Sequence, residues 1–128
     1  MSETHTAEGG CHCGAVRFRV RFAAPPVLLD CNCSMCAKTG YLHLIVARDD
    51  FVLLRGAEDL TEYRFNSGTA RHLFCRHCGI KSFYVPRSHP DGYSVSWRAL
   101  DGVESVVPEI AAYDGRNWEA ARAALGDG

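Results

Sequence analysis

The chain has 128 residues, of which 47% are hydrophobic and 23% are charged, and its formal net charge is −1 at pH 7. This length predicts a single domain with enough apolar surface to form a core. The near-neutral charge gives no overall signature of nucleic-acid binding, and no apolar run is long enough to span a bilayer. The first ten residues lack the apolar stretch of a secretory signal, so we expect a cytoplasmic protein in a reducing environment.

The N-terminal part of the sequence predicts a tail followed by one amphipathic strand. Residues 1–9 are expected to be a mobile tail, and residues 10–128 are expected to form the domain. Residues 16–22 alternate between apolar and arginine side chains, which predicts a half-buried strand. We interpret its arginine face as solvated, although the face is also a candidate patch for an acidic substrate or partner. The arginines are Arg17, Arg19 and Arg21.

The rest of the chain is predicted to form short strands separated by turn residues. Further strands are expected at residues 27–30, 41–47, 51–54, 62–65, 70–74, 82–85 and 93–97, and the last two are expected to pair. The one predicted helix is the alanine-rich segment 118–125, with Asn117 as its N-cap. The pattern therefore predicts a mainly β, sandwich-like fold with a short C-terminal helix.

The seven cysteines are arranged as one triplet and two pairs. An odd number of cysteines in a chain without an export signal argues against a disulfide framework and favours metal binding. Four protein ligands close a zinc site, whereas three leave one coordination position open. The count therefore predicts two zinc ions, one that stabilises the fold and one that takes part in chemistry. The triplet is Cys31, Cys33 and Cys36, and the pairs are Cys11 with Cys13 and Cys75 with Cys78.

Each of the two pairs is followed by a glycine, which eases the tight turn that points backbone N–H groups at the sulfur atoms. Together the pairs predict a closed, four-cysteine zinc site that connects the first strand of the domain to a distant hairpin. The spacing leaves open a second arrangement, in which Cys11 or Cys13 completes the triplet. His12 and His77 lie inside the pairs, and we interpret them as solvated loop residues.

The triplet predicts a different kind of site. A zinc ion bound by three thiolates is a weak Lewis acid, and its soft surroundings suit a further sulfur ligand. A thiol that arrives at the open position would lose its proton on binding. We therefore expect Cys31, Cys33 and Cys36 to hold and activate a small thiol. The alternative is a second closed site, with His43 on the next predicted strand as the fourth ligand.

Together, the motifs C-x-C-G, C-x-C-S-x-C and F-C-x-x-C-G resemble those of the GFA family, the glutathione-dependent formaldehyde-activating enzymes and their relatives. The motifs lie at residues 11–14, 31–36 and 74–79, and the resemblance spans nearly the whole chain. Segments 82–93 and 114–119 are similar to the branch of the family that contains centromere protein V. Asn32 differs from the histidine that is common in the family, but it carries no thiolate, so the metal assignment does not depend on it.

The resemblance implies a β-tent fold with two zinc ions. It assigns the structural zinc to the two cysteine pairs and the catalytic zinc to the triplet. It also implies a carbon–sulfur lyase that forms or cleaves S-(hydroxymethyl)glutathione, with glutathione or a similar small thiol as the partner.

The residues that would contact the substrate are less well defined by the sequence. Arg87 lies in a loop without a predicted core role and is our first candidate to hold a carboxylate of the thiol. Arg64 and Arg71 are further candidates, and the hydroxyl groups of Ser34 and Tyr84 are candidate general acids. The competing hypothesis is a non-catalytic, zinc-built binding module with a protein or nucleic-acid partner, which a closed fourth ligand at the triplet would favour.

Overall fold

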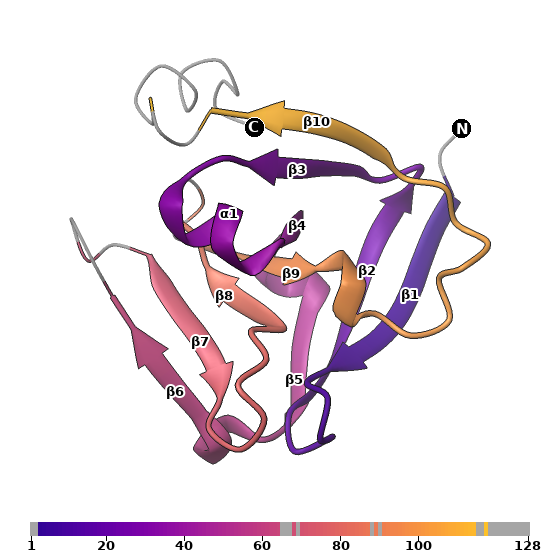
Figure 1. Cartoon of the computed structure of the whole chain (residues 1–128). Helices are drawn as coiled ribbons and strands as arrows, with labels where there is room; N and C mark the ends of the chain where they lie inside the picture. The colour runs from indigo at the N-terminus through magenta and orange to yellow at the C-terminus, as the bar shows by residue number, and fades with distance from the viewer. Residues whose placement is uncertain are drawn as a thin grey trace.

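The computed structural model describes residues 3–64, 68, 70–87, 89, 91–114 and 117. The fold is mainly β and consists of two open sheets with one short α-helix in this part of the chain (Figure 1). The predicted fold class is therefore confirmed, whereas the predicted helix at residues 118–125 lies outside the described residues. Among the helices of the described segments, none has the length and apolar character needed to cross a membrane.

The smaller sheet has three strands in the order β1-β2-β5, and neighbouring strands are antiparallel. β2 is the strand that the alternation of apolar residues and arginines predicted. Its apolar side chains are buried and its arginines lie on the outer face. The three strands are β1 (Glu3–Gly10), β2 (Arg17–Ala24) and β5 (Phe51–Arg55).

The larger sheet has seven strands in the order β10-β3-β4-β9-β8-β7-β6. β10 runs parallel to β3, and the other neighbouring strands are antiparallel. The predicted pairing of residues 82–85 with residues 93–97 is confirmed by the pair β8–β9. The strands are β3 (Val27–Cys31), β4 (Leu42–Ala47), β6 (Leu60–Tyr63), β7 (Arg71–Cys75), β8 (Phe83–Val85), β9 (Gly92–Ser96) and β10 (Glu109–Tyr113).

Short helical segments connect several of these strands. The α-helix α1 (Ser34–Thr39) follows β3 directly. Three single 3-10 turns are η1 (Arg48–Asp50), η2 (Ala57–Asp59) and η3 (Trp97–Ala99).

The expectation of a mobile tail at residues 1–9 differs from the structure, in which β1 pairs with β2 along its whole length. The sequence of β1 is mostly polar, so it carries no strand pattern of its own. Its partner supplies the contacts: the ring of His5 stacks on Phe22, with centroids 5.7 Å apart, and Arg19 forms an ion pair with Glu8 at 3.1 Å. Pairing to a strong neighbouring strand therefore overrides the weak local preference.

β10 was also missed by the sequence analysis, because it is an exposed edge strand with little alternation. It covers the free edge of β3 in parallel register, with Tyr113 opposite Cys31. The contact continues past the strand ends, where the Asn32 N–H donates to the Tyr113 carbonyl at 3.2 Å and the Asn32 side chain donates to Asp114 at 3.0 Å. β10 therefore supports the segment that carries the cysteine triplet.

The hydrophobic core lies between the two sheets and is centred on Phe18, which is fully buried. The Phe18 ring stacks on Phe51 of β5 at 5.3 Å and meets the edge of Phe83 of β8 at 5.7 Å. Aromatic pairs of this geometry add to the free energy of area burial. The core thus connects the smaller sheet to the middle of the larger one.

The arginine face of β2 is neutralised within the chain. Arg17 pairs with Asp101 at 2.8 Å, Arg19 pairs with Glu8, and Arg21 pairs with Asp50 at 2.7 Å. These arginines therefore form ion pairs on a solvated face, as we interpreted them, and offer little unbalanced charge to an acidic partner.

We predict that Gly56→Ala destabilises the fold. Gly56 has a φ of 96°, and an added Cβ would collide with the carbonyl oxygen of Ala15 and lie 2.7 Å from the Cα of Val16. The expected loss is about 3 kcal/mol in the free energy of unfolding, measured by urea denaturation. The control is Gly102→Ala, which has a φ of 71° but open space around the new Cβ, and should cost about 1–2 kcal/mol. Equal losses of unfolding free energy in the two variants would show that the close approach to Ala15 does not contribute to the destabilisation.

Candidate functional site

The four cysteines of the two pairs converge in the structure. Their sulfur atoms all lie within 4.8 Å of one another, and the Sγ atoms of Cys11 and Cys75 each lie 3.6 Å from that of Cys13. Sulfur atoms placed tetrahedrally at about 2.3 Å from a zinc ion are about 3.8 Å apart. The geometry and the all-sulfur donor set therefore fit a closed zinc site. The fourth member is Cys78.

This cluster forms where the two sheets meet. Cys11 directly follows β1 of the smaller sheet, and Cys75 is the last residue of β7 in the larger sheet. Backbone N–H groups point at the sulfur atoms, from Val16 to Cys11 at 3.3 Å and from His77 to Cys75 at 3.4 Å. The spacing had left open whether Cys11 or Cys13 joins the triplet. In the structure both lie with Cys75 and Cys78.

The triplet is assembled by the junction of β3 and α1. Cys31 is the last residue of β3, Cys33 is the N-cap of α1, and Cys36 lies in the first turn of the helix. The Cys36 N–H donates to the Cys33 sulfur at 3.3 Å, as in an N-cap made by a hydroxyl side chain. The three sulfur atoms lie within 4.8 Å of one another.

The helix α1 was not predicted, because six residues are too few to show a periodic apolar pattern. Its C-terminal signal was nevertheless present in the sequence. Gly40 follows Thr39 and adopts a φ of 64°, and its N–H donates to the Cys36 carbonyl at 3.1 Å. This left-handed glycine is the usual end of a helix, and it fixes the direction in which the chain leaves the triplet.

Within the described segments, no histidine, cysteine, aspartate or glutamate joins the triplet as a fourth group within 4.8 Å. His43, the candidate fourth ligand, lies on β4 with its Nδ1 at 2.8 Å from the Ser94 hydroxyl and 3.1 Å from the Tyr84 hydroxyl. The closed arrangement of three cysteines and His43 is therefore not present in the structure.

The three thiols of the triplet interact strongly with one another. Hydrogen bonds from Cys31 and then Cys36 lower the pKa of Cys33 to about 2, and the same close contacts raise the pKa of Cys36. These contacts therefore favour loss of the proton from Cys33 over loss from Cys36. Metal binding has to release the thiol protons that remain, so the metal affinity falls as the pH falls.

A small cavity of about 30 Å³ lies beside Cys31. This volume accommodates roughly one or two water-sized molecules. His43, which lines the cavity, is only 3% exposed, and its Nε2 has no hydrogen-bond partner among the described residues. The cavity is lined by Leu29, Cys31, His43, Ile45, Tyr84, Pro86 and Tyr113.

The protonation of this cavity follows from its burial. Burial, with the positive charge of Lys81 as a second cause, lowers the pKa of His43 to about 4, so the imidazole is neutral at pH 7. Burial and the negative charge of Cys36 raise the pKa of the Tyr84 hydroxyl, which therefore keeps its proton. Nδ1 of His43 can accept a hydrogen bond from the hydroxyl group of either Ser94 or Tyr84, and in that tautomer the imidazole proton lies on Nε2.

Lys81 is a buried cation that the sequence analysis missed, since lysine is almost never fully buried. It is 9% exposed, and its Nζ lies 3.1 Å from Nδ1 of His72. The ammonium group also lies over the rings of Tyr84 and Tyr41, at 4.3 Å and 4.8 Å from the centroids. The sequence gives one indication that Lys81 lies near the site, which is its position three residues after Cys78.

The predicted substrate-contacting residues have different surroundings. Arg64 and Arg71 both form ion pairs with Glu62, at 2.7 Å and 2.6 Å, so the two guanidinium groups share one carboxylate. Arg87 is exposed and follows Pro86, which lines the cavity beside Cys31. Ser34 is exposed at the start of α1.

Fold and clusters together define a mainly β protein with two groups of cysteines, each able to hold a metal ion. The family profile described as glutathione-dependent formaldehyde-activating enzyme matches residues 6–116. The chain therefore belongs to the GFA family, as the sequence motifs indicated.

Two relatives agree with this assignment. A Halomonas elongata protein that carries the family's name is 40% identical over 80 residues, which cover 56% of this chain and 50% of that protein. The chain thus matches about half of the length of this relative. The crystal structure of a Rhodobacter sphaeroides protein superposes with a TM-score of 0.72 at 36% identity, covering 81% of this chain and 99% of that chain.

We predict that the two clusters respond differently to loss of a thiol. Cys75→Ser should strongly destabilise or unfold the domain, because metal binding between the two sheets contributes directly to the folding free energy. Cys33→Ser should cost less, since the triplet lies within one continuous segment. Thermal unfolding of the two zinc-loaded variants would compare them, and an equal collapse of both would show that the triplet is structural too.

Proposed function

We propose that this protein is a zinc-dependent carbon–sulfur lyase-type enzyme that forms or cleaves the adduct of a small thiol and a small aldehyde. The supporting observation is the difference between the two clusters: four cysteines converge in one, and three converge in the other with no fourth group among the described residues. Membership of the GFA family indicates glutathione or a related thiol and formaldehyde as the first substrates to test.

The two clusters would hold two zinc ions with different roles. Cys11, Cys13, Cys75 and Cys78 would hold the structural ion, and the triplet would hold the catalytic one. When bound by the triplet, zinc would lower the pKa of an incoming thiol and hold it as a thiolate.

The reaction requires a proton at the oxygen of the aldehyde. In the forming direction, the thiolate sulfur bonds to the carbonyl carbon, the carbonyl electron pair moves to oxygen, and the oxygen takes one proton from water. In the cleaving direction, the hydroxyl proton returns to water, the carbonyl forms again and the carbon–sulfur bond breaks. A hydrogen-bond donor beside Cys31 that stabilises the negative oxygen therefore serves both directions.

His43 and Tyr84 are suited to this task. The Nε2–H of His43 would donate a hydrogen bond to the carbonyl oxygen, which strengthens as the oxygen becomes negative. The Tyr84 hydroxyl lies 3.1 Å from Nδ1 on the other side of the ring, and by donating to Nδ1 it would favour this tautomer. Tyr84 thus acts through His43 here, which differs from the direct role that the sequence analysis considered.

The cavity also limits the aldehyde. A volume of about 30 Å³ beside Cys31 suits a one-carbon carbonyl compound and excludes larger aldehydes unless side chains move. Arg87, next to the cavity wall at Pro86, is our candidate for one carboxylate of the thiol.

We predict that a small thiol binds at the triplet with release of about one proton near neutral pH. Cobalt in place of zinc should show a changed thiolate charge-transfer band when glutathione is added, and calorimetry in buffers of different ionisation enthalpy would count the proton. Cys33→Ser should remove the response. An unchanged cobalt spectrum with every small thiol tested would contradict the proposed function and favour the binding-module hypothesis.

We also predict that His43→Phe lowers kcat for adduct formation about 100-fold or more, because the hydrogen bond that stabilises the negative oxygen is lost. Tyr84→Phe should lower kcat less, since Ser94 still donates to Nδ1. Zinc content and the dissociation constant of glutathione should stay near the parent values in both variants. A loss of zinc in His43→Phe would instead indicate that His43 supports the metal.

A further inference from the structure

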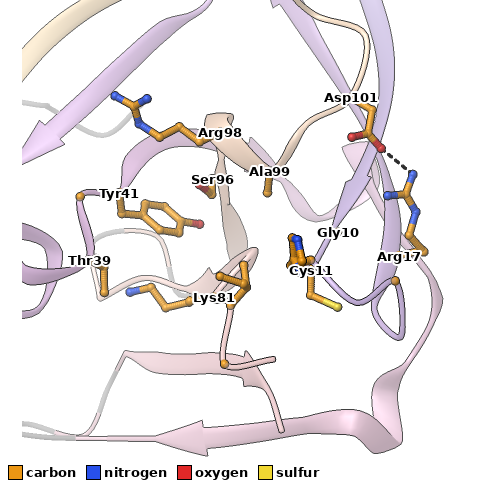
Figure 2. Close-up of a pocket in the computed structure, with 15 residues that line it drawn as sticks. Gly10, Cys11, Arg17, Thr39, Tyr41, Lys81, Ser96, Arg98, Ala99 and Asp101 are labelled. Carbon is orange, nitrogen blue, oxygen red and sulfur yellow. Dashed lines mark hydrogen bonds and ion pairs between the residues drawn. The ribbon is translucent and has the colours of Figure 1, made fainter. Parts of the chain in front are cut away.

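Lys81 is a buried cation on the wall of a pocket of about 650 Å³ (Figure 2). Its head group points toward Thr39 and Tyr41, where the chain leaves α1 (Figure 2). Within the described part of the chain, no ion pair joins Lys81 to a carboxylate. A buried charge is costly unless an opposite charge or a set of hydrogen bonds compensates it. Another group therefore has to balance this cation.

The immediate neighbours of Lys81 compensate its charge only in part. Its Nζ lies 3.1 Å from Nδ1 of His72, and 4.3 Å and 4.8 Å from the ring centroids of Tyr84 and Tyr41. Burial, with the charge of Lys81 as a second cause, lowers the pKa of His72 to about 4, so this imidazole is neutral at pH 7. A neutral acceptor and two ring faces carry no net negative charge.

The two tyrosines connect Lys81 to the cysteine triplet. Tyr41 directly follows Gly40, whose N–H donates to the Cys36 carbonyl at 3.1 Å. Tyr84 lines the small cavity together with Cys31. Both tyrosines are buried, so water does not screen charges on either side of them as it does at the surface.

The charge of Lys81 also acts on the triplet. Burial lowers the pKa of Lys81, and the negative charges of Cys36, Cys33 and Cys31 oppose this effect, in that order. Burial, followed by the negative charge of Cys36, raises the pKa of both tyrosines. The ammonium group, the two rings and the triplet therefore interact electrostatically, although in the sequence Lys81 follows the four-cysteine group.

The charge of an occupied triplet matches that of Lys81. A divalent zinc ion with three thiolates carries one net negative charge, and the ammonium group carries one positive charge. An anion at the open position adds a second negative charge, whereas a neutral ligand adds none. Two unit charges about 10 Å apart in a protein interior alter such an equilibrium by about tenfold.

We propose that Lys81 supplies the counter-charge of the triplet and makes its open position selective for an anionic fourth ligand. Lys81 acts through its charge and is not itself a ligand. The assignment rests on the proposed function for the presence of a metal ion at the triplet. In the forming direction the cation would favour a bound thiolate, and in the cleaving direction it would stabilise the departing one.

The test compares ligands of different charge at the cobalt-loaded triplet. Azide binds as an anion, 2-mercaptoethanol binds as a thiolate, and imidazole binds as a neutral molecule. The proteins are the parent, Lys81→Met, Lys81→Arg and, as a matched control, Lys38→Met. Lys38 is the only other lysine of the chain and is exposed in the last turn of α1. Dissociation constants come from the cobalt spectrum, and Cys33→Ser identifies the response of the triplet.

In Lys81→Met, we expect the dissociation constants of azide and 2-mercaptoethanol to rise about tenfold and that of imidazole to stay the same. Lys81→Arg keeps the charge, so its constants should stay within about threefold of the parent values. Lys38→Met should bind all three ligands as the parent does.

Two results would overturn the assignment and leave the proposed function standing. One is parent-like azide and 2-mercaptoethanol binding in folded Lys81→Met. The other is an equal weakening of azide and imidazole, which would indicate a packing role in place of a charge role. If Lys81→Met does not fold, as judged by circular dichroism, Lys81→Gln, which still donates to His72, decides in the same way.

Failure of the proposed function gives a different pattern. If azide alters the cobalt spectrum of the parent and no small thiol does, the proposed function fails, and azide against imidazole still decides the role of Lys81. If none of the three ligands alters the spectrum, the open position is absent and the counter-charge assignment is overturned as well.

Discussion

Four sulfur atoms from two distant turns meet at the junction of the sheets, and the geometry of the rest of the molecule depends on this junction. One turn connects β1 to β2, and the other connects β7 to β8. A metal ion held by these four cysteines would link residues far apart in the chain and so reduce the entropy of the unfolded chain. The aromatic contacts of Phe18 join the same two sheets from within the core. The pocket of about 650 Å³ lies next to this junction, and Lys81 is one of the residues that line it.

The two cysteine groups are built in different ways. The four-cysteine group needs both sheets in place before its ligands meet. The triplet needs only the end of one strand and the first turn of one helix, so its geometry is set locally by the cap of α1. A group of ligands that forms on one segment leaves space on its other side for a ligand from solution. His43 and Tyr84 approach that space from β4 and β8 without joining the ligand set.

The sequence predicted the parts of the structure that carry a local signal. The alternation in β2 and the spacing of the seven cysteines both led to groupings that the structure contains. β1 and β10 were not predictable from their own residues, because each is an edge strand that a stronger partner stabilises. The burial of Lys81 and the hydrogen bonds of His43 depend on residues far away in the chain. Contacts between strands leave no trace in the spacing of residues. The sequence therefore suggested His43 as a ligand, whereas in the structure its Nδ1 lies against the hydroxyl groups of Ser94 and Tyr84.

The position of β10 has a consequence for the order in which the protein is completed during synthesis. All four cysteines of the closed group have been translated by residue 78, so the two sheets can be joined early. The three cysteines of the triplet are available even sooner, but β3 lacks its parallel neighbour until residues 109–113 have emerged. For that interval the nascent chain carries three thiols at the end of an unpaired strand edge. During that interval the triplet is open to oxidation or to capture of the wrong metal.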